Sequence, residues 1–239
     1  LNGVTHGDGL FVAVGSNGTI LTSPDGVRWT RRSSGTNDRL NGVTHGDGLF
    51  VAVGDLGTIL TSSDGVSWTA RSSGTFRRNL LGVTYANGLF VAVGDRGTVL
   101  TSPDGVSWTE ESSGTSLFGV THGDGLFVAV GPDGTVLTSP DGVSWTRQAS
   151  GTGAGLEGVT HGAGLFVAVG SGGTVLTSLS GVNWTARASG TNQDLFGVTH
   201  GDGLFVAVGV GGTVLTSPDG VSWTRQDSGT YAWLEDVTY

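Results

Sequence analysis

The sequence contains no cysteine, no methionine and no lysine. Without cysteine, disulfide scaffolds and thiolate metal sites are excluded, so packing and hydrogen bonds must hold the fold together. All 11 basic residues are arginines, set against 20 acidic residues, and the formal net charge is -9. The arginines are scattered and form no basic stripe that would neutralise a run of phosphates. We therefore expect neither nucleic acid nor an anionic membrane as a partner.

Long hydrophobic runs are also absent. The longest are pentads such as residues 10–14, far below the ~20 apolar residues needed to cross a bilayer, so no membrane insertion is expected. An apolar fraction of 36% with only 13% charged residues argues against disorder, because disordered chains combine low hydrophobicity with dense charge. The chain begins at Leu1 without a charged-then-apolar leader, and we expect a piece of a longer protein or an engineered repeat array.

Internal repeats organise the rest of the sequence. Copies of about 39 residues span residues 1–39, 40–79, 80–116, 117–155, 156–194 and 195–233, and residues 234–239 begin a seventh. Each copy predicts four short strands, which in the first copy are residues 1–6, 10–15, 19–23 and 27–34. They are rich in Val, Leu, Phe, Thr and Trp and are separated by Gly, Asn, Asp and Pro turns. No segment has helical periodicity.

Four antiparallel strands followed by a looser crossing are typical of a propeller blade. We therefore predict an all-β fold, a β-propeller of six four-stranded antiparallel blades in one domain over residues 1–239. Residues 234–239 would be an extra innermost strand, because six blades need only six. Strand exchange between chains of a homo-oligomer, or a seven-bladed parent, would equally account for it.

A Ser-Pro-Asp-Gly-Val-Arg-Trp motif at residues 23–29 returns in variant form in the other copies, at 62–68, 102–108, 139–145 and 217–223. It resembles the Asp-box, or bacterial neuraminidase repeat, of sialidases, photosystem II assembly-factor propellers and many bacterial surface proteins. The family pattern has one more residue between Asp and Trp, and the fifth copy reads Leu179-Ser180-Gly181 in place of Pro-Asp-Gly. The resemblance implies a propeller and favours an extracellular or bacterial cell-surface location.

The box is expected to be structural, with the Asp accepting backbone N–H groups of the turn and the Trp packed beneath it. The residues assigned this role are Asp25, Trp29, Asp64, Trp68, Asp104, Trp108, Asp141, Trp145, Trp184, Asp219 and Trp223.

Catalysis, cofactors and metals are not expected. Sialidases combine an arginine cluster, a Tyr–Glu pair and an Asp acid/base, but the only tyrosines here are Tyr85, Tyr231 and Tyr239, and no copy carries such a set. Uniform copies also argue against an active site, which needs different residues converging on one atom. Histidines that end the predicted first strands would lie too far apart for a metal that needs ligands near ~2 Å. We interpret them as structural or hydrogen-bonding groups.

The copies differ mainly at one end of the predicted blades, formed by the second-to-third-strand turns and the crossings between blades. Aromatic, Leu and Arg residues, which anchor protein interfaces, are enriched there. We therefore predict a non-enzymatic propeller that binds a protein or peptide through this variable end. The candidate contact residues are Asn2, Asn41, Phe76, Arg77, Arg78, Leu81, Arg96, Phe118, Glu157, Phe196 and Trp233.

Two alternatives remain open. A multivalent lectin would use repeated sugar sites at the opposite end of the blades, where the copies hardly differ, because several identical pockets raise the overall affinity for a repeated glycan. Its candidate residues are His6, Asp8, His45, Asp47, His122, Asp124, His161, His200 and Asp202. A purely structural or engineered scaffold would bind at neither end.

Overall fold

The computed structural model describes residues 1–75 and 77–239. Its strands form six separate four-stranded antiparallel sheets, each made from four strands consecutive in sequence. The fold class is a six-bladed β-propeller, as predicted, with one blade for each repeat. Among the described residues the helical elements are four 3-10 turns, and none of these is long and apolar enough to span a membrane.

The chain divides into two compact units, residues 1–116 and 117–239, with three blades in each. The first unit contains β1 (Gly3–Gly7), β2 (Leu10–Gly15), β3 (Thr19–Ser23), β4 (Thr30–Arg32), β5 (Leu40–Gly46), β6 (Leu49–Gly54), η1 (Asp55–Gly57), β7 (Ile59–Ser62), β8 (Thr69–Arg71), β9 (Leu80–Ala86), β10 (Leu89–Gly94), η2 (Asp95–Gly97), β11 (Thr98–Ser102) and β12 (Thr109–Ser112).

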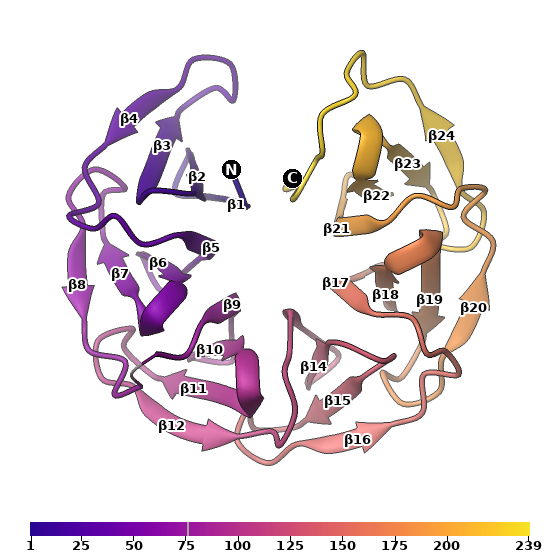
Figure 1. The fold of residues 1–239 in the computed structure, drawn as a ribbon, viewed down its shortest axis with the longest axis horizontal. Coiled ribbons are helices and arrows are strands. Elements are labelled where there is room, and N and C mark those ends of the chain that lie inside the picture. The colour runs from indigo at the N-terminus through magenta and orange to yellow at the C-terminus, as the bar shows by residue number, and fades with distance from the viewer. Residues whose placement is uncertain (76) are drawn as a thin grey trace. The chain divides into compact units, whose positions relative to one another are not determined.

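The second unit contains β13 (Gly119–Gly123), β14 (Leu126–Val130), β15 (Val136–Ser139), β16 (Thr146–Gln148), β17 (Leu156–Gly162), β18 (Leu165–Gly170), η3 (Ser171–Gly173), β19 (Thr174–Ser178), β20 (Thr185–Arg187), β21 (Leu195–Gly201), β22 (Leu204–Gly209), η4 (Val210–Gly212), β23 (Val214–Ser217) and β24 (Thr224–Gln226). The four strands of a blade are called A to D in chain order (Figure 1).

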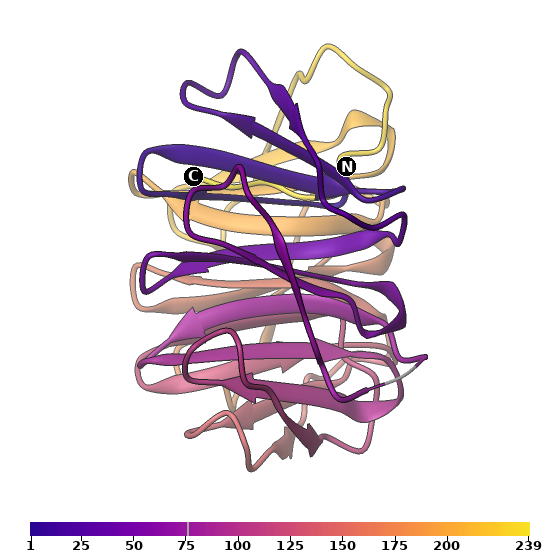
Figure 2. The same ribbon diagram turned by 90° about the vertical axis from the view of Figure 1, so that its left-hand side faces the viewer.

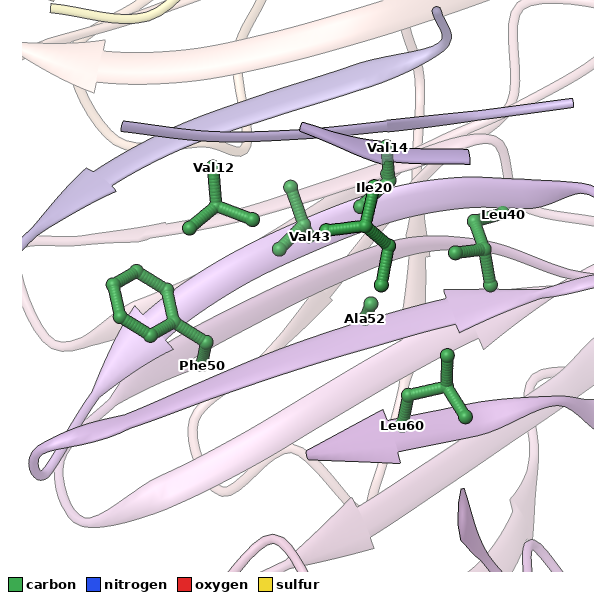
Figure 3. Close-up of a cluster of buried hydrophobic side chains, with 8 residues drawn as sticks. All are labelled: Val12, Val14, Ile20, Leu40, Val43, Phe50, Ala52 and Leu60. Atoms are coloured by element: carbon green, nitrogen blue, oxygen red, sulfur yellow. The ribbon is translucent and has the colours of Figure 1, made fainter. Parts of the chain in front are cut away.

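The core lies between neighbouring blades of a unit, and Figure 2 shows the blades of the first unit stacked. Val12 and Val14 of β2 and Ile20 of β3 pack against Phe50 and Leu60 of the second blade (Figure 3). Equivalent buried clusters join the second blade to the third, the fourth to the fifth and the fifth to the sixth. Side chains alternate between the two faces of a strand, so each interior blade buries both of its faces.

Two predicted strands have shorter bounds in the structure. The first A strand begins at Gly3, not Leu1, and the first D strand is only Thr30–Arg32, where residues 27–34 were predicted. The D strand starts late because the N–H groups of Val27 and Arg28 bind the Asp25 carboxylate and thus belong to the preceding turn.

Residues 234–239 occupy the place of an A strand without forming one. A Cβ built on Gly197 of β21 would come within 2.9 Å of the Asp236 Cα, just as one on Gly158 would meet the Gly197 Cα at 3.3 Å. No strand is assigned over residues 234–239, so the predicted seventh strand is wrong as secondary structure. Each A strand pairs with the B strand of its own blade, whereas the Leu234 N–H donates to the Gly209 carbonyl of the B strand of the sixth blade, at 3.1 Å.

Candidate functional site

The A–B and C–D turns make up the constant end of the blades, and the Asp-box turn is its most regular feature. The Oδ1 atom of Asp25 accepts hydrogen bonds from the N–H groups of Val27 and Arg28, both at 2.9 Å, and from the Ser23 hydroxyl at 3.0 Å. The same three donors recur around Asp64, Asp104, Asp141 and Asp219.

These bonds stabilise the ionised carboxylate. Backbone N–H groups of Ser67 and Val66 are the largest causes that lower the pKa of Asp64 to about 2. The corresponding donors lower the pKa values of Asp104 and Asp219 to about 2, and those of Asp25 and Asp141 also lie below the ordinary value. In the fifth copy Ser180 replaces the acid, and its hydroxyl accepts one longer bond, from Val182 at 3.3 Å.

The box tryptophans are less buried than expected. Trp29 is 39% exposed, and the other five are half-buried. Each indole Nε1–H donates to the carbonyl of the box glycine at 2.9–3.1 Å. The box glycine itself lies on the preceding blade: Gly65 has φ 68°, and a Cβ there would overlap the Leu10 side chain. The box therefore stabilises its own turn by hydrogen bonds and packs that turn against the neighbouring blade.

A second constant contact joins the A strands. The ring of His45 lies over Gly7 of the preceding blade, where a Cβ would overlap it, and its Nε2 is 3.1 Å from the Asp8 carboxylate. His161 has the same relation to Gly123 and Asp124, also at 3.1 Å. We call this ring-on-glycine contact with its acid the A-strand latch.

The other candidate lectin residues occupy related positions. His6 and Asp47 are exposed, and His6 stacks on Phe11 at 4.3 Å. Burial lowers the pKa of His122, and the nearby His161 is a second, smaller cause of the same shift. Tyr239 lies over Gly201, and its hydrogen bond with Asp202 raises its pKa. Among the described residues no group of three His, Cys, Asp or Glu side chains forms a metal site.

The opposite end of the blades carries the predicted contact residues, and a backbone irregularity presents several of them. The pairing of the A strand with the B strand shifts around the second A-strand residue in blades 2, 3, 5 and 6. That residue is Asn41, Leu81, Glu157 or Phe196. A bulge of this kind re-aims a side chain at the end of a sheet. The sequence showed that this position varies but gave no sign of the bulge.

In the first unit the asparagines at the second position of the repeat, Asn2 and Asn41, bind neighbouring strands. The Asn2 Nδ2 donates to the Leu40 carbonyl at 2.8 Å. The Asn41 Nδ2 reaches both the Leu80 carbonyl and the Asp55 carboxylate at 2.9 Å. These two side chains thus link successive blades, while Leu81 in the third blade is half-buried.

Arginines and a leucine in strained turns complete the variable end of the first unit. Arg96 and Leu56 have φ values of 53° and 57° inside the B–C turns, and Arg77 has φ 62° in a crossing. Residues other than glycine rarely adopt this backbone conformation. Arg78 donates to Thr98 at 3.2 Å and lies 3.5 Å from the Glu110 carboxylate. The predicted contact residue Phe76 lies outside the described residues.

In the second unit the same positions are aromatic and acidic. Phe118, Glu157 and Phe196 are all half-buried. Trp233, in the segment after the last D strand, is 65% exposed, and its ring centroid is 6.0 Å from that of Phe196. Burial raises the pKa of Glu157, and the charge of nearby Asp194 adds to the rise.

Residues that the sequence did not single out support this end. The Asp194 Oδ1 accepts from the Gly172 N–H at 2.7 Å. In the first unit Asp38 accepts from the Thr58 hydroxyl at 2.8 Å, and Asn79 accepts from the Leu56 N–H at 3.1 Å. All three lie in crossings, one or two residues before the next A strand, and an Asx side chain in that place is the signal that would have found them.

Charge is divided unevenly between the units. Residues 1–116 carry eight arginines and ten acids, a formal charge of -2, whereas residues 117–239 carry three arginines and ten acids, a formal charge of -7. The second unit is thus the more acidic of the two.

Comparison with known proteins supports the fold. Residues 4–117 match the family described as the DUF6242 beta propeller domain. Among curated protein sequences, none matches this chain. Solved structures similar to it include YCF48 from Cyanidioschyzon merolae, with 19% identity and a TM-score of 0.73 over 95% of this chain and 84% of that one.

Two further structures share the fold. YCF48 bound to D1 peptide has 18% identity and a TM-score of 0.73 over 93% of this chain and 80% of that one. The computationally designed Ika8 protein has 12% identity and a TM-score of 0.69 over 97% of this chain and 70% of that one. At these identities the likeness concerns the fold alone.

Proposed function

We propose that this chain is a non-catalytic binding propeller that recognises a protein or peptide through its variable end. The observation that carries the proposal is that residues differing between otherwise uniform copies are displayed there from bulges and left-handed turns. Such local irregularities concentrate at functional places, where they aim side chains. The arginines of the first unit and the aromatic residues of the second are the types that dominate binding energy at interfaces.

The comparison with YCF48 bound to D1 peptide supports the proposal, because that protein has the same fold. Our proposal places the chain, with its variant box, in the wider Asp-box superfamily at the bacterial cell surface or outside the cell.

The constant end is less suited to ligand binding. Asp8 and Asp124 already bind His45 and His161, and the box acids bind their own turns. A lectin would have to compete with these contacts at each repeated site. A purely structural or engineered scaffold would leave the variable, exposed side chains without a role.

A peptide array probed with the full chain tests the proposal. We expect captured peptides to be lost when Phe118 and Phe196 are changed to Ala, and retained when Asp8 is changed to Asn. Truncating a central aromatic anchor costs about 2 kcal/mol or more, or roughly thirtyfold in affinity. If no captured peptide depends on either phenylalanine, the proposal fails.

Two parallel assays address the alternatives. A glycan array on which binding depends on Asp8 and its equivalents would favour the lectin. Turnover of a fluorogenic sialoside would contradict the non-catalytic assignment.

A further inference from the structure

A row of equivalent positions crosses the variable end of the second unit. A Cβ on Gly119 would lie 3.1 Å from the Glu157 carbonyl, one on Gly158 would lie 2.7 Å from the Phe196 carbonyl, and one on Gly197 would lie 3.2 Å from the Glu235 carbonyl. The residues before these glycines and before Asp236 therefore follow one another across adjacent chain segments. They alternate between aromatic and acidic: Phe118, Glu157, Phe196 and Glu235.

The aromatic members form an incompletely buried apolar surface. Phe196 and Trp233 make a tilted ring contact at 6.0 Å, with the ring planes 47° apart. Trp233 remains 65% exposed, and the nearby Tyr231 is 94% exposed. Tyr231 also lines a groove of about 630 Å³, which is bounded by the B–C turn of the sixth blade, by the end of β24 with Arg225, and by the segment that follows it, with Asp227. Large exposed aromatic side chains beside a groove indicate a binding surface.

The acidic members decide what kind of partner fits. In the part of the chain that the structure describes, no hydrogen bond or ion pair satisfies the carboxylate of half-buried Glu157. Its Oε1 lies 3.4 Å from the position of a Cβ on Gly155, and the neighbouring charge is the like charge of Asp194. A carboxylate held in this way gains most from an incoming cation that also donates hydrogen bonds.

The first unit offers no such environment. At the equivalent row positions Asn2 and Asn41 already donate to backbone carbonyls. Arg39 donates to the Asn2 side chain, and Asn41 occupies the Asp55 carboxylate. A cation attracted to this chain is therefore directed to the second unit, which carries a formal charge of -7.

We infer that this acidic aromatic row, Phe118, Glu157, Phe196 and Glu235, together with Trp233 beside Phe196 and Asp194 near Glu157, binds an arginine side chain of a basic peptide segment. The guanidinium pairs with Glu157 and lies against the aromatic rings, which attract cations through their faces. Apolar residues beside the arginine contact Trp233. The inference rests on the proposed peptide-binding function and specifies its partner.

Isothermal titration of the full chain with acetyl-Gly-Leu-Arg-Leu-Gly-amide, and with the same peptide carrying citrulline in place of arginine, tests it. Citrulline keeps the shape of arginine and removes the charge. We expect the arginine peptide to bind about tenfold more tightly than the citrulline peptide, since a charge-assisted pair exceeds a neutral hydrogen bond by roughly this factor.

Two variants make the test specific. Glu157→Gln should bring the two affinities together, whereas the matched control Glu111→Gln, on β12 of the first unit, should leave the tenfold difference intact. Equal loss in both variants would mean general attraction to an acidic protein and would overturn the inference.

Other results separate the inference from the function on which it rests. If both peptides bind equally and Phe196→Ala weakens both, peptide recognition stands and the arginine preference is wrong. If neither peptide binds, the inference is overturned, and the peptide array decides the proposed function by itself.

Discussion

His200 packs its ring over Gly162, yet Ala163, the next residue, leaves the buried Nε2 atom of His200 without a hydrogen-bond partner among the described residues. In the other copies of this latch the residue after the glycine is acidic, as with Asp8 beside His45. The fifth blade therefore has the ring-on-glycine contact without its acid.

Ala163→Asp should restore the hydrogen bond and stabilise the protein. A net hydrogen bond contributes about 0.5–1.5 kcal/mol, and Asp tolerates the φ of 49° at this position better than Ala. Thermal or urea unfolding would measure the gain. Ala163→Gly serves as the matched control, because it relieves the backbone without providing an acceptor. An Asp gain no larger than the Gly gain would contradict the prediction.

Much of the fold could be predicted because the turn-forming residues of each blade lie within its own repeat. Gly, Asn, Asp and Pro separate runs of β-forming residues at the same positions in every copy, and one blade per repeat follows from that spacing. The bounds of β4 were missed because Val27 and Arg28, which are typical strand or neutral residues, bind Asp25 in the turn. Only the hydrogen-bonded structure reveals that competition.

Residues 234–239 and the candidate site show what local sequence leaves out. The segment has the sequence of a strand, but in the structure it forms none, and its Leu234 N–H donates to the Gly209 carbonyl of β22. From the sequence, Asn2 and Asn41 are candidate contact residues for a partner, but in the structure their side chains donate to backbone carbonyls 38 and 39 residues away. The bulges that present Glu157 and Phe196 depend on how the A strand meets the B strand, and neither strand encodes this alone.

The box acids should make the protein sensitive to acid in a defined range. Their pKa in the folded state is lowered, to about 2 for Asp64, Asp104 and Asp219, from an ordinary value of 3.8. Their stabilisation is complete above pH 3.8 and is lost as the pH falls toward 2, because the unfolded chain then binds more protons.

Unfolding experiments between pH 5 and 2 would show this as a falling free energy of unfolding. The triple variant Asp64→Asn, Asp104→Asn and Asp219→Asn should have a flatter profile. Ser180→Ala, in the box without an acid, is the control and should leave the slope unchanged. An unaltered slope in the triple variant would be evidence against the assigned role of the acids.

Gly201→Ala should loosen the segment that ends in Tyr239. A Cβ at Gly201 would overlap the Tyr239 ring, and overpacking of this kind costs about 1–3 kcal/mol. We expect a lower unfolding temperature and faster hydrogen exchange in residues 234–239. Gly153→Ala is the matched control, since a Cβ there meets no atom within 4 Å. Equal behaviour of the two variants would show that Tyr239 does not rest on Gly201 in solution.

Leu56→Gly should stabilise the first unit. Leu56 is 54% exposed and has φ 57°, a conformation that costs a residue with a Cβ roughly 1–2 kcal/mol. Part of this gain is offset by the entropy of glycine in the unfolded chain, which leaves an increase of about 0.5–1 kcal/mol in the free energy of unfolding. The fifth and sixth blades already have Gly172 and Gly211 at this position. A loss of stability would mean that the Leu56 side chain makes a favourable contact that outweighs the strain.

Every A-strand latch takes its glycine and acid from one repeat and its aromatic ring from the next. A duplicated repeat therefore carries both the glycine–acid pair and the aromatic ring, so the new copy can form this contact with the repeats on either side of it. Such an array can gain or lose copies without first evolving a compatible joint. Diversification is then least constrained at residues outside the latch, and the variable end holds many of them.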